Sequence, residues 1–400
     1  MIYLDNAATT PMSDSVRGEM FPWLTEQFGN PGSVYDLGRN AAAAIRLARE
    51  RVAMYLSCEP EQVIFTGGGS DGNTMVFRGL EHSLRRNWKT HLVVSRAEHE
   101  SIIQAVAWMQ KRGFTVTWLD VDCDGAVTAE QVREAIRQNT GLVSVMFANN
   151  ELNGRNPVEE IGIACRERGV LFHVDAVQAA GAYPLCPDLI ACDFLTISSH
   201  KIFGPKGCGA LYARDKSLLE PMVFGGEGQE YGLHAGTQNV PAIVGFGQAC
   251  ADLTVFPLQD YLQIRSCKMI FCAELERLYS EAVAEGLLPA AILHFNSGYA
   301  DTDAPTECGK TVSLRFDGVE SETLVLMLST QGVYVSSGSA CNSKASVPSR
   351  VLLAAGLTPE QASQTVRVTF SSRNSFQEAK DAAAVFIRCV KALLSLEVVR

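Results

Sequence analysis

The sequence predicts an α/β protein in which helices cover a mostly parallel sheet and a smaller α+β domain is attached. Three observations predict this class. The chain has 400 residues, more than one ordinary hydrophobic core accommodates. Strand-like and helix-like segments alternate over about 200 residues, as they do in the βαβ units of parallel sheets. Beyond residue 255, the pattern changes to a few strands among long helices.

The elements of the first part follow from hydrophobic periodicity. Apolar residues at helical spacing predict helices over 38–57, 69–86, 101–113, 128–138 and 158–169. Short apolar runs predict strands over 61–66, 91–95, 114–121, 141–148, 170–178, 193–200 and 209–214. Gly113 and Gly169 end two of the helices, and Thr128 is suited to cap the start of another. We therefore expect one large domain over residues 15–255.

The second part contains fewer strands and longer helices. Helices are predicted over 261–282, 321–332 and 375–396, and strands over 311–317, 333–337 and 365–370. No proline-rich linker or low-complexity tract marks a boundary. We expect residues 1–14 and 256–400 to form the small domain, with a loop around residues 335–348.

The composition limits what the chain binds. Lys and Arg number 34 against 44 Asp and Glu, and the net charge of −10 argues against direct nucleic-acid binding. Mean hydropathy is +0.06, yet no apolar run approaches the roughly 18 residues of a membrane helix. The first ten residues lack the basic region and long apolar stretch of a signal peptide. We therefore expect a cytoplasmic protein that binds no membrane.

Twelve cysteines are present without any pairing pattern. Neither a CxxC pair nor a Cys/His cluster with zinc spacing occurs, so we expect no metal site and no disulfide framework. Most of the cysteines have apolar neighbours and are expected to be reduced, buried thiols. Cys341 differs, because it lies in the run of small polar residues at 335–343, which predicts an exposed loop. An exposed thiol on such a loop is available for chemistry.

Three further segments lie at expected carboxyl ends of strands, where open α/β sheets bind ligands. The glycine-rich turn at 67–72 is either a plain turn or an anion site at a helix N-terminus. Asp175 is either a surface carboxylate or a buried one that needs a cationic partner. Lys201 is either a solvated side chain or an amine placed for a Schiff base. Together, amine, carboxylate and anion site match the aldehyde, ring nitrogen and phosphate of pyridoxal 5′-phosphate (PLP).

Motifs occur in order along nearly the whole chain. They are LDNAATTP at 4–11, FGNPGS at 28–33, AEHES at 97–101, NNE at 149–151, HVDAVQ at 173–178, SSHKIFGPKG at 198–207, AGTQN at 235–239, SSGSAC at 336–341 and TVRVTF at 365–370. Through these motifs the chain resembles the cysteine desulfurases of the NifS/IscS type, within the class-V aminotransferases. Their combined order and spacing is far more specific than any one motif. The resemblance implies PLP-dependent fold type I, with a mostly parallel seven-stranded sheet in the large domain.

The resemblance also implies how PLP is bound. It assigns the Schiff base to Lys201, the ring nitrogen to Asp175, the phenolic oxygen to Gln178, and ring stacking with proton movement to His99. It assigns the phosphate to Gly69, Ser70, Ser198 and His200, together with the partner subunit's Thr237. Taken without the resemblance, a core histidine is the default interpretation of His99.

The substrate and sulfur-carrying residues are implied in the same way. Asn150 and Arg367 are expected to hold the substrate carboxylate, and Arg367 suits this because its planar fork is bidentate. A turn residue and a strand-surface charge are the alternatives for these two. Cys341 is the implied nucleophile, and the alternative is a surface thiol without a role.

Several positions depart from the pattern of the family. Gly69-Ser70-Asp71 stands where Ala-Thr-Glu is usual, and the other departures are Thr74 for Asn, Tyr35 for His, His234 for Arg and Glu227 for Gly. Ser70 retains the hydroxyl and Asp71 the charge, so we expect phosphate binding to survive. Glu227 and His234 lie in the segment that, as the resemblance implies, contributes to the active site of the partner subunit. The SSGSAC form of the cysteine motif indicates the long-loop group of the family.

The function implied by the resemblance is that of a homodimeric cysteine desulfurase. It converts L-cysteine to L-alanine and passes sulfur, as a persulfide on Cys341, to a protein acceptor. Iron–sulfur cluster assembly, tRNA thiolation and DNA phosphorothioation are the pathways that remain open. Two other functions also remain open: a selenocysteine lyase or another PLP enzyme of this fold, and a non-catalytic scaffold that binds a sulfur acceptor.

Overall fold

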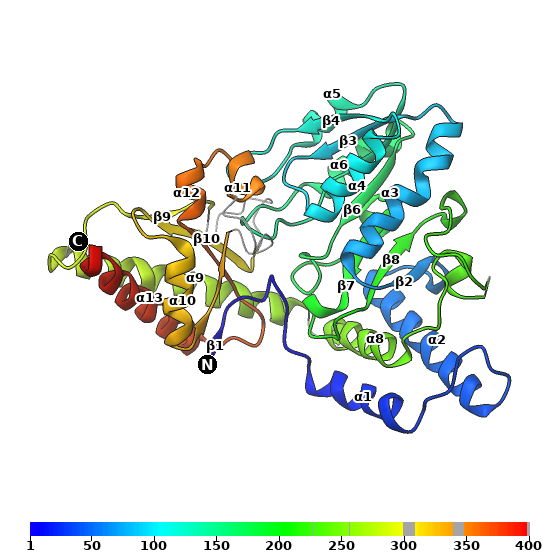
Figure 1. Cartoon of the computed structure of the whole chain (residues 1–400), viewed down its shortest axis with the longest axis horizontal. Coiled ribbons are helices and arrows are strands. Elements are labelled where there is room, and N and C mark those ends of the chain that lie inside the picture. Colours follow the sequence, from blue (N-terminus) through cyan, green and yellow to red (C-terminus); the bar gives the residue numbers. More distant parts are fainter. Residues whose placement is uncertain (227, 256, 299–308, 339–347, 398–400) are drawn as a thin grey trace.

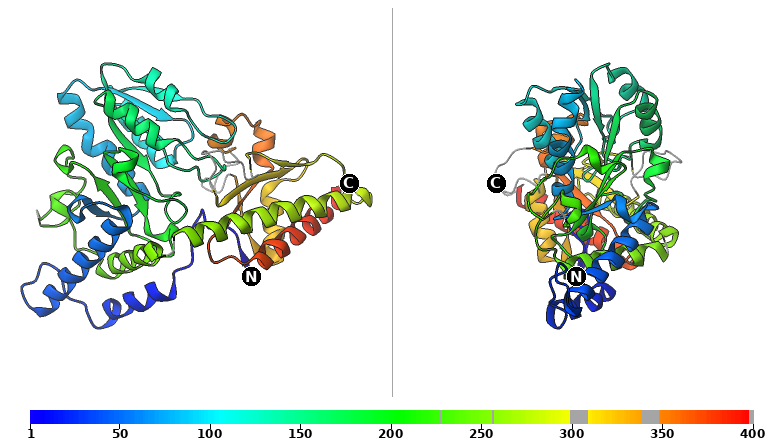
Figure 2. Two further views of the ribbon diagram at one scale, coloured as in Figure 1. Left: turned by 180° about the vertical axis from the view of Figure 1, so that it is seen from behind. Right: turned by 90° about the vertical axis from the view of Figure 1, so that its right-hand side faces the viewer.

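Two sheets of different size organise the chain (Figure 1). The computed structural model describes residues 1–226, 228–255, 257–298, 309–338 and 348–397. The large sheet is built from strands between residues 63 and 213, and the main small sheet from strands between residues 293 and 369. A 28-residue helix, α9 (Pro257–Ala284), runs from the large lobe along the small one (Figure 2).

The large sheet has seven strands in the order β2-β8-β7-β6-β5-β3-β4. The strands are β2 (Val63–Thr66), β3 (His91–Ser95), β4 (Thr115–Leu119), β5 (Thr140–Ser144), β6 (Leu171–Asp175), β7 (Phe194–Ser198) and β8 (Gly209–Ala213). Only β8 runs antiparallel to its neighbours. The predicted mostly parallel, seven-stranded sheet is therefore confirmed. Because five of its seven strands are fully buried, those segments read as short apolar runs.

Helices cover both faces of this sheet, and each face has its own hydrophobic core. One face is covered by α1 (Asp14–Thr25), α2 (Asp36–Leu56), α5 (Ala129–Ala135), α6 (Val158–Glu167) and α8 (Val240–Val255). The other is covered by α3 (Gly69–Arg86) and α4 (Glu100–Gln110). Alternate strand residues point to opposite cores, as Leu92 and Val93 do.

The small lobe has a four-stranded antiparallel sheet and its own core. Its strands are β9 (Leu293–Phe295), β10 (Thr311–Phe316), β12 (Ser336–Ser337) and β13 (Thr365–Thr369), and α9, α10 (Ser321–Thr330) and α13 (Phe376–Glu397) pack with them. The N-terminal strand β1 (Ile2–Tyr3) pairs in parallel with β11 (Val333–Tyr334). The chain thus starts in the small lobe, where Asp5 and Asn6 still contact Thr369, and crosses to the large one after residue 6. The domain limits at 15 and 255 stay a prediction.

Short elements complete the chain. They are η1 (Pro60–Gln62), α7 (Pro187–Ile190), η2 (Ser199–Lys201), η3 (Lys216–Leu218), η4 (Glu230–Gly232), α11 (Arg350–Ala354) and α12 (Pro359–Ser363). Within the described ranges, no single helix is long and apolar enough to cross a membrane, and only the bent pair of α8 and α9 reaches that length and composition together.

Candidate active site

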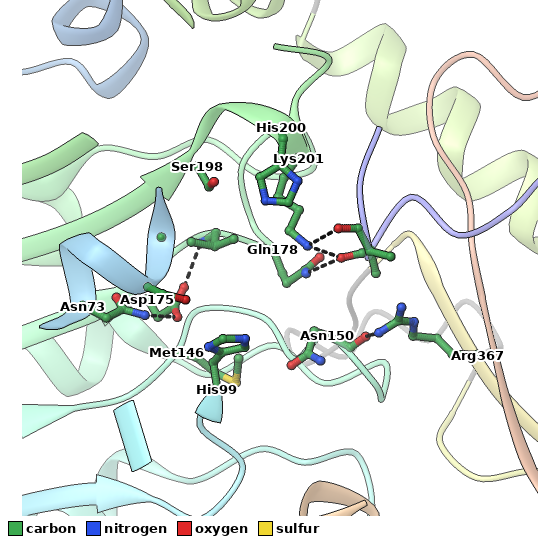
Figure 3. A pocket seen from close by; sticks show the side chains of 15 residues that line it. Asn73, His99, Met146, Asn150, Asp175, Gln178, Ser198, His200, Lys201 and Arg367 are labelled. Carbon is green, nitrogen blue, oxygen red and sulfur yellow. Dashed lines mark hydrogen bonds between the residues drawn. The ribbon is translucent and has the colours of Figure 1, made fainter. Parts of the chain in front are cut away.

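One cavity of about 300 Å³ opens where the carboxyl ends of β6 and β7 meet the N-terminus of α3 (Figure 3). Ten of the twelve residues singled out from the sequence line it: Gly69, Ser70, His99, Asn150, Asp175, Gln178, Ser198, His200, Lys201 and Arg367. The sequence reasoning did not single out the remaining lining residues, which are Ala7, Ala8, Asn73, Met146 and Val177. Residues from both lobes therefore meet in one small space.

The floor of the cavity carries a buried carboxylate. Asp175 ends β6, is 4% exposed, and lies beside Asn73 in Figure 3. Its Oδ2 accepts a 2.7 Å hydrogen bond from Asn73 Nδ2, and its Oδ1 accepts one of 3.0 Å from the Val177 amide. These two donors fix the orientation of the carboxylate, which satisfies the need of a buried charge for partners.

Lys201 reaches the cavity from η2, directly after β7. Its Nζ donates to the carbonyl oxygens of Ala7 and Ala8, the second at 2.8 Å. Gln178 Nε2 donates to the same Ala7 oxygen at 3.0 Å, while Gln178 Oε1 is buried without a hydrogen-bond partner among the described residues. The N-terminal crossing segment is thus a wall of the site. The sequence pattern of this segment did not predict that its carbonyl groups line the site.

The glycine turn brings the backbone of α3 close to the strand ends. Gly68 has φ +146°, and a Cβ on Gly69 would lie 2.7 Å from Val177 Cγ2. Ser198 Oγ, at the end of β7, is buried and has no hydrogen-bond partner in the described part of the chain. Free N–H groups at a helix N-terminus beside an unsatisfied hydroxyl suit an anionic group.

His200 lies next to this turn. Its Nδ1 is 3.2 Å from Thr9 Oγ1. Burial, assisted by the charges of Lys201 and Lys206, lowers the pKa of His200 to about 4. The ring is therefore neutral at physiological pH and acts as a hydrogen-bonding group there.

His99 stands at the opposite side of the cavity as the N-cap of α4. Its Nδ1 accepts a 3.1 Å hydrogen bond from the Ser101 amide and lies 2.8 Å from Ser101 Oγ. Because Nδ1 is the acceptor, the neutral ring carries its proton on Nε2. Ser101 Oγ also accepts from Asn73 at 3.0 Å, so one chain of contacts joins His99 to Asp175.

Arg367 enters from β13 of the small lobe and is 5% exposed. Its Nη2 lies 2.8 Å from Asp5 Oδ1, and its Nη1 donates to the Asn150 carbonyl at 3.1 Å. Its Nε is buried with no hydrogen-bond partner in the ranges that the structure covers. Figure 3 shows Asn150 and Arg367 together on the side of the pocket away from Asp175.

Two acids behind the cavity, the buried Glu98 and the partly exposed Glu151, were not predicted as site residues. Glu98 is fully buried, and burial raises its pKa well above the usual value. Burial likewise raises the pKa of Glu151, although the Ser349 hydroxyl that donates to it opposes this. Arg350 donates to the carbonyls of Arg96 and Glu98. Apolar side chains of the same segments form a small separate core of Ala97, Leu152, Val351, Leu352 and Ala362.

Of the two remaining predicted site residues, Thr237 does not line the cavity. Thr237 is exposed on its own subunit. Cys341 lies outside the described residues, as do Cys308 and the departure Glu227. The other ten cysteines are free thiols, seven of them buried, and Cys123 is the exposed member of the ten. Burial and two neighbouring aspartates raise the pKa of Cys123, so its thiolate is disfavoured.

The class-V aminotransferase family model matches residues 2–381 of this sequence. The chain belongs to the class-V aminotransferase family. Cysteine desulfurase IscS of Methanosarcina thermophila is 37% identical over 396 residues, covering 99% of this chain and 93% of that relative. A solved NifS-like protein has a TM-score of 0.86 at 28% identity and covers 99% of both chains. SspA, solved in complex with cysteine, has a TM-score of 0.77 at 32% identity and covers 94% of this chain and all of its own.

Membership in the class-V aminotransferase family confirms the predicted fold type I and the predicted PLP dependence. The residues of this cavity fit the cofactor. The unsatisfied Ser198 hydroxyl and the glycine turn offer donors for its phosphate, and the unsatisfied Gln178 Oε1 faces the same cavity. Asp175 is a fixed carboxylate for the ring nitrogen, and Lys201 brings an amine into the same space.

Proposed function

We propose that this chain is a cysteine desulfurase that takes sulfur from L-cysteine, leaves L-alanine, and passes the sulfur as a persulfide on Cys341 to an acceptor protein. One observation carries the proposal: Lys201, Asp175 and Arg367 line a single cavity of about 300 Å³ in a class-V chain. That cavity offers an amine, a ring-nitrogen partner and a carboxylate-binding group. Relatives named cysteine desulfurase, 34–37% identical over nearly the full length, support the choice of substrate.

PLP would be held by Lys201, Asp175, Gln178, Ser198 and the glycine turn. When bound, it supplies an electron sink that makes the α-proton of an attached amino acid acidic and weakens the bond from Cβ to sulfur. The fixed carboxylate of Asp175 would keep the ring nitrogen of bound PLP protonated and so strengthen this effect.

The substrate carboxylate binds to Arg367. Asp5 and the Asn150 carbonyl hold two of the guanidinium nitrogens, which fixes the plane of the group before substrate arrives. The buried Nε has no hydrogen-bond partner in the described ranges, and each terminal nitrogen keeps a second N–H, so donors remain for the ligand. An orientation held from both lobes places the α-carbon of the substrate toward Lys201.

Proton movement falls to Lys201 and His99. The Lys201 amine, once free, accepts the α-proton of the substrate. His99 keeps its ring proton on Nε2, because Nδ1 accepts from Ser101, and so it presents an N–H rather than a lone pair to the cavity. The carbonyl oxygens of Ala7 and Ala8 accept hydrogen bonds from the amine in the structure, and they can accept them again after each turnover.

Sulfur transfer is assigned to Cys341. Its thiolate attacks the substrate sulfur, an S–S bond forms, and the Cβ–S bond breaks with its electron pair left on carbon. A proton added at that carbon completes alanine. Exchange of the persulfide with a thiolate of the acceptor returns Cys341 to its starting state.

A homodimer in the cytoplasm is part of the proposal. Thr237 is exposed and absent from the cavity of its own subunit, as the partner-serving role requires. Large apolar side chains are exposed near Thr237 in the sequence, at Phe224, and on the α1–α2 connection, at Phe28, Val34 and Tyr35. Such exposed apolar surface is typical of a protein interface. The free thiols suit a reducing compartment. An active monomer in sedimentation would contradict this part.

The decisive experiment combines absorbance with two variants. Purified protein supplied with PLP should absorb in the visible, and borohydride or Lys201→Ala should abolish that absorbance. Cys341→Ala should keep the absorbance and lose sulfide release from cysteine, while the control Cys123→Ala should keep both. Sulfide release by Cys341→Ala at the wild-type rate would overturn the persulfide route, and absence of any PLP absorbance would favour the non-catalytic scaffold.

The acceptor is the open part of the proposal. Iron–sulfur assembly, tRNA thiolation and DNA phosphorothioation each require a different thiol-bearing partner. Capture of proteins that receive labelled sulfur from the Cys341 persulfide would identify it. The Cys341→Ala variant is the control, because it should label no acceptor.

A further inference from the structure

The segment that carries Thr237 is fixed to the large lobe by a buried ion pair. Glu230 has a 3% exposed side chain and lies 2.8 Å and 2.9 Å from the two terminal nitrogens of Arg49 on α2. Glu230 also accepts 2.8 Å hydrogen bonds from the Phe65 amide and from Gln238 Nε2. Glu230 and Tyr231 adopt positive φ angles of 40° and 60°, which the buried pair stabilises.

The same segment is fixed a second time, at the proposed phosphate cradle. His234 Nε2 lies 2.9 Å from Asp71 Oδ2. That oxygen also accepts a 2.7 Å hydrogen bond from the Gly67 amide. Asp71 directly follows Gly69 and Ser70, which line the cavity. His234 is therefore joined through one carboxylate to both sides of the glycine turn.

The electrostatic role of this contact follows from the position of Asp71. A carboxylate in the first turn of α3 lies close to the expected site of a phosphate dianion and repels it. A protonated His234 offsets that charge. The charged groups recorded around His234 are Asp71 and Glu230, and the charge of Glu230 is paired with Arg49. Within the described segments, His234 is thus the cation that compensates the negative charge of Asp71.

The pKa directions agree with an ion pair. The hydrogen bond with Asp71 raises the pKa of His234, against the opposing effect of burial. Burial alone would raise the pKa of Asp71, but the hydrogen bonds from His234 and Gly67 outweigh it and lower the pKa. Both shifts favour the charged forms, so the pair is charged over a wider pH range than the isolated groups would be, and it loses charge as the pH rises through the pKa of His234.

We propose that His234 is a positioning residue for the cofactor phosphate: through Asp71 it holds the glycine turn in place and offsets the carboxylate beside the phosphate. The family's usual Arg at this position would hold the charge at every pH, whereas this chain holds it only while His234 is protonated. Phosphate retention thus weakens at alkaline pH in this protein. The proposal rests on the proposed PLP role of the cavity.

The test measures the release rate of PLP from the holoenzyme by visible absorbance between pH 6 and pH 9. His234→Arg should remove the part of the pH dependence that His234 supplies. His234→Gln should release PLP about five to ten times faster than wild type at pH 6, with little difference at pH 9. The matched control is His82→Gln, which changes an exposed histidine on α3, the helix that carries Asp71, and it should follow wild type. Ratios to wild type at each pH cancel the pH dependence common to all variants.

A second arm uses pyridoxal, which lacks the phosphate. The three variants should then release the ligand at the wild-type rate, because nothing remains for the cradle to hold. Identical PLP release profiles for wild type, His234→Arg and His234→Gln would overturn the proposal. An equal effect on pyridoxal would also overturn it, because the contact would then act on the fold and not on the phosphate. Failure of the wild-type protein to bind PLP would instead refute the proposed function.

Discussion

Asn73 donates a 2.7 Å hydrogen bond from Nδ2 to Oδ2 of Asp175 and so joins α3 to the end of β6. The same amide donates to Ser101 Oγ at 3.0 Å, and that hydroxyl lies 2.8 Å from His99 Nδ1. Asn73 is 1% exposed. One neutral side chain therefore sets the positions of both the acid and the histidine of the cavity.

Asn73→Ala should lower turnover of cysteine by about 10- to 100-fold, because a hydrogen bond to a buried charge contributes about 1.5–3 kcal/mol. The visible absorbance of bound PLP should shift as well, since Asp175 loses a donor that fixes it. Asn87→Ala, at the far end of the same helix, is exposed and should change neither quantity. An unchanged spectrum with Asn73→Ala would show that Asp175 does not depend on this contact.

Arg367→Lys should raise the KM for cysteine by about 10- to 100-fold with a smaller loss of kcat. Lysine keeps the charge but cannot contact Asp5, Asn150 and a substrate carboxylate at once with the geometry of a planar fork. Steady-state kinetics measures the split between KM and kcat. Arg388→Lys, on the exposed face of α13, is the control and should match wild type. A loss confined to kcat would place Arg367 outside carboxylate binding.

Much of the large lobe was predictable because its strands are buried on both faces. Strands such as β5 and β6 read as short apolar runs; the predicted range contains β6 and misses only the first residue of β5. Helices with one apolar face, such as α3, were predicted as well. The helix α8 was not, because its sequence is apolar on most sides and lacks the helical period that a half-exposed helix shows. The helix α1 was missed for the opposite reason, because it buries only Val16 and Met20.

The candidate site divides in a similar way. Lys201, Asp175 and the glycine turn follow strands, so their shared edge could be inferred from a parallel sheet. The positions of the carbonyl oxygens of Ala7 and Ala8 could not be inferred, because these residues lie 194 and 193 positions before Lys201 in the sequence. Backbone groups carry no residue-type signal. The burial of Glu98 likewise follows from packing between lobes, which no local pattern contains.

Glu98→Gln should stabilise the protein at alkaline pH. Burial raises the pKa of Glu98, so the folded state binds a proton that the unfolded state releases above pH 4.5, and the wild type loses stability as pH rises. Glutamine keeps the Oε1 that accepts from the Met146 amide at 2.7 Å and does not titrate. The difference in free energy of unfolding should grow by up to about 1.4 kcal/mol per pH unit above pH 4.5. Thermal unfolding from pH 4 to pH 9 measures it.

The control for this prediction is Glu322→Gln, an exposed glutamate in the first turn of α10. Its unfolding profile should parallel that of the wild type over the same pH range. Parallel profiles for Glu98→Gln and wild type would mean that Glu98 is ionised in the folded protein, balanced by the nearby Arg350.

Arg350→Gln should slow sulfur transfer while cofactor binding stays intact. Arg350 lies nine positions after Cys341, and its guanidinium donates to the carbonyls of Arg96 and Glu98, immediately before His99. Val351 and Leu352 pack on Ala97 and Leu152 in the same place. One end of the cysteine-bearing segment is thereby fixed to the two large-lobe segments that carry His99 and Asn150.

Glutamine cannot reach both carbonyls with a charged donor, so that end should loosen and kcat should fall about tenfold or more. The KM for cysteine should change little, since Arg367 binds the carboxylate. Loosening predicts a further result that lost folding stability would not produce: iodoacetamide should alkylate Cys341 at a different rate in the variant, while Cys123 reacts at the wild-type rate. Arg388→Gln is the control. An unchanged alkylation rate together with an unchanged kcat would contradict this prediction and would mean that apolar contacts alone position the segment. In that case Leu352→Ala, which removes such a contact, should slow sulfur transfer.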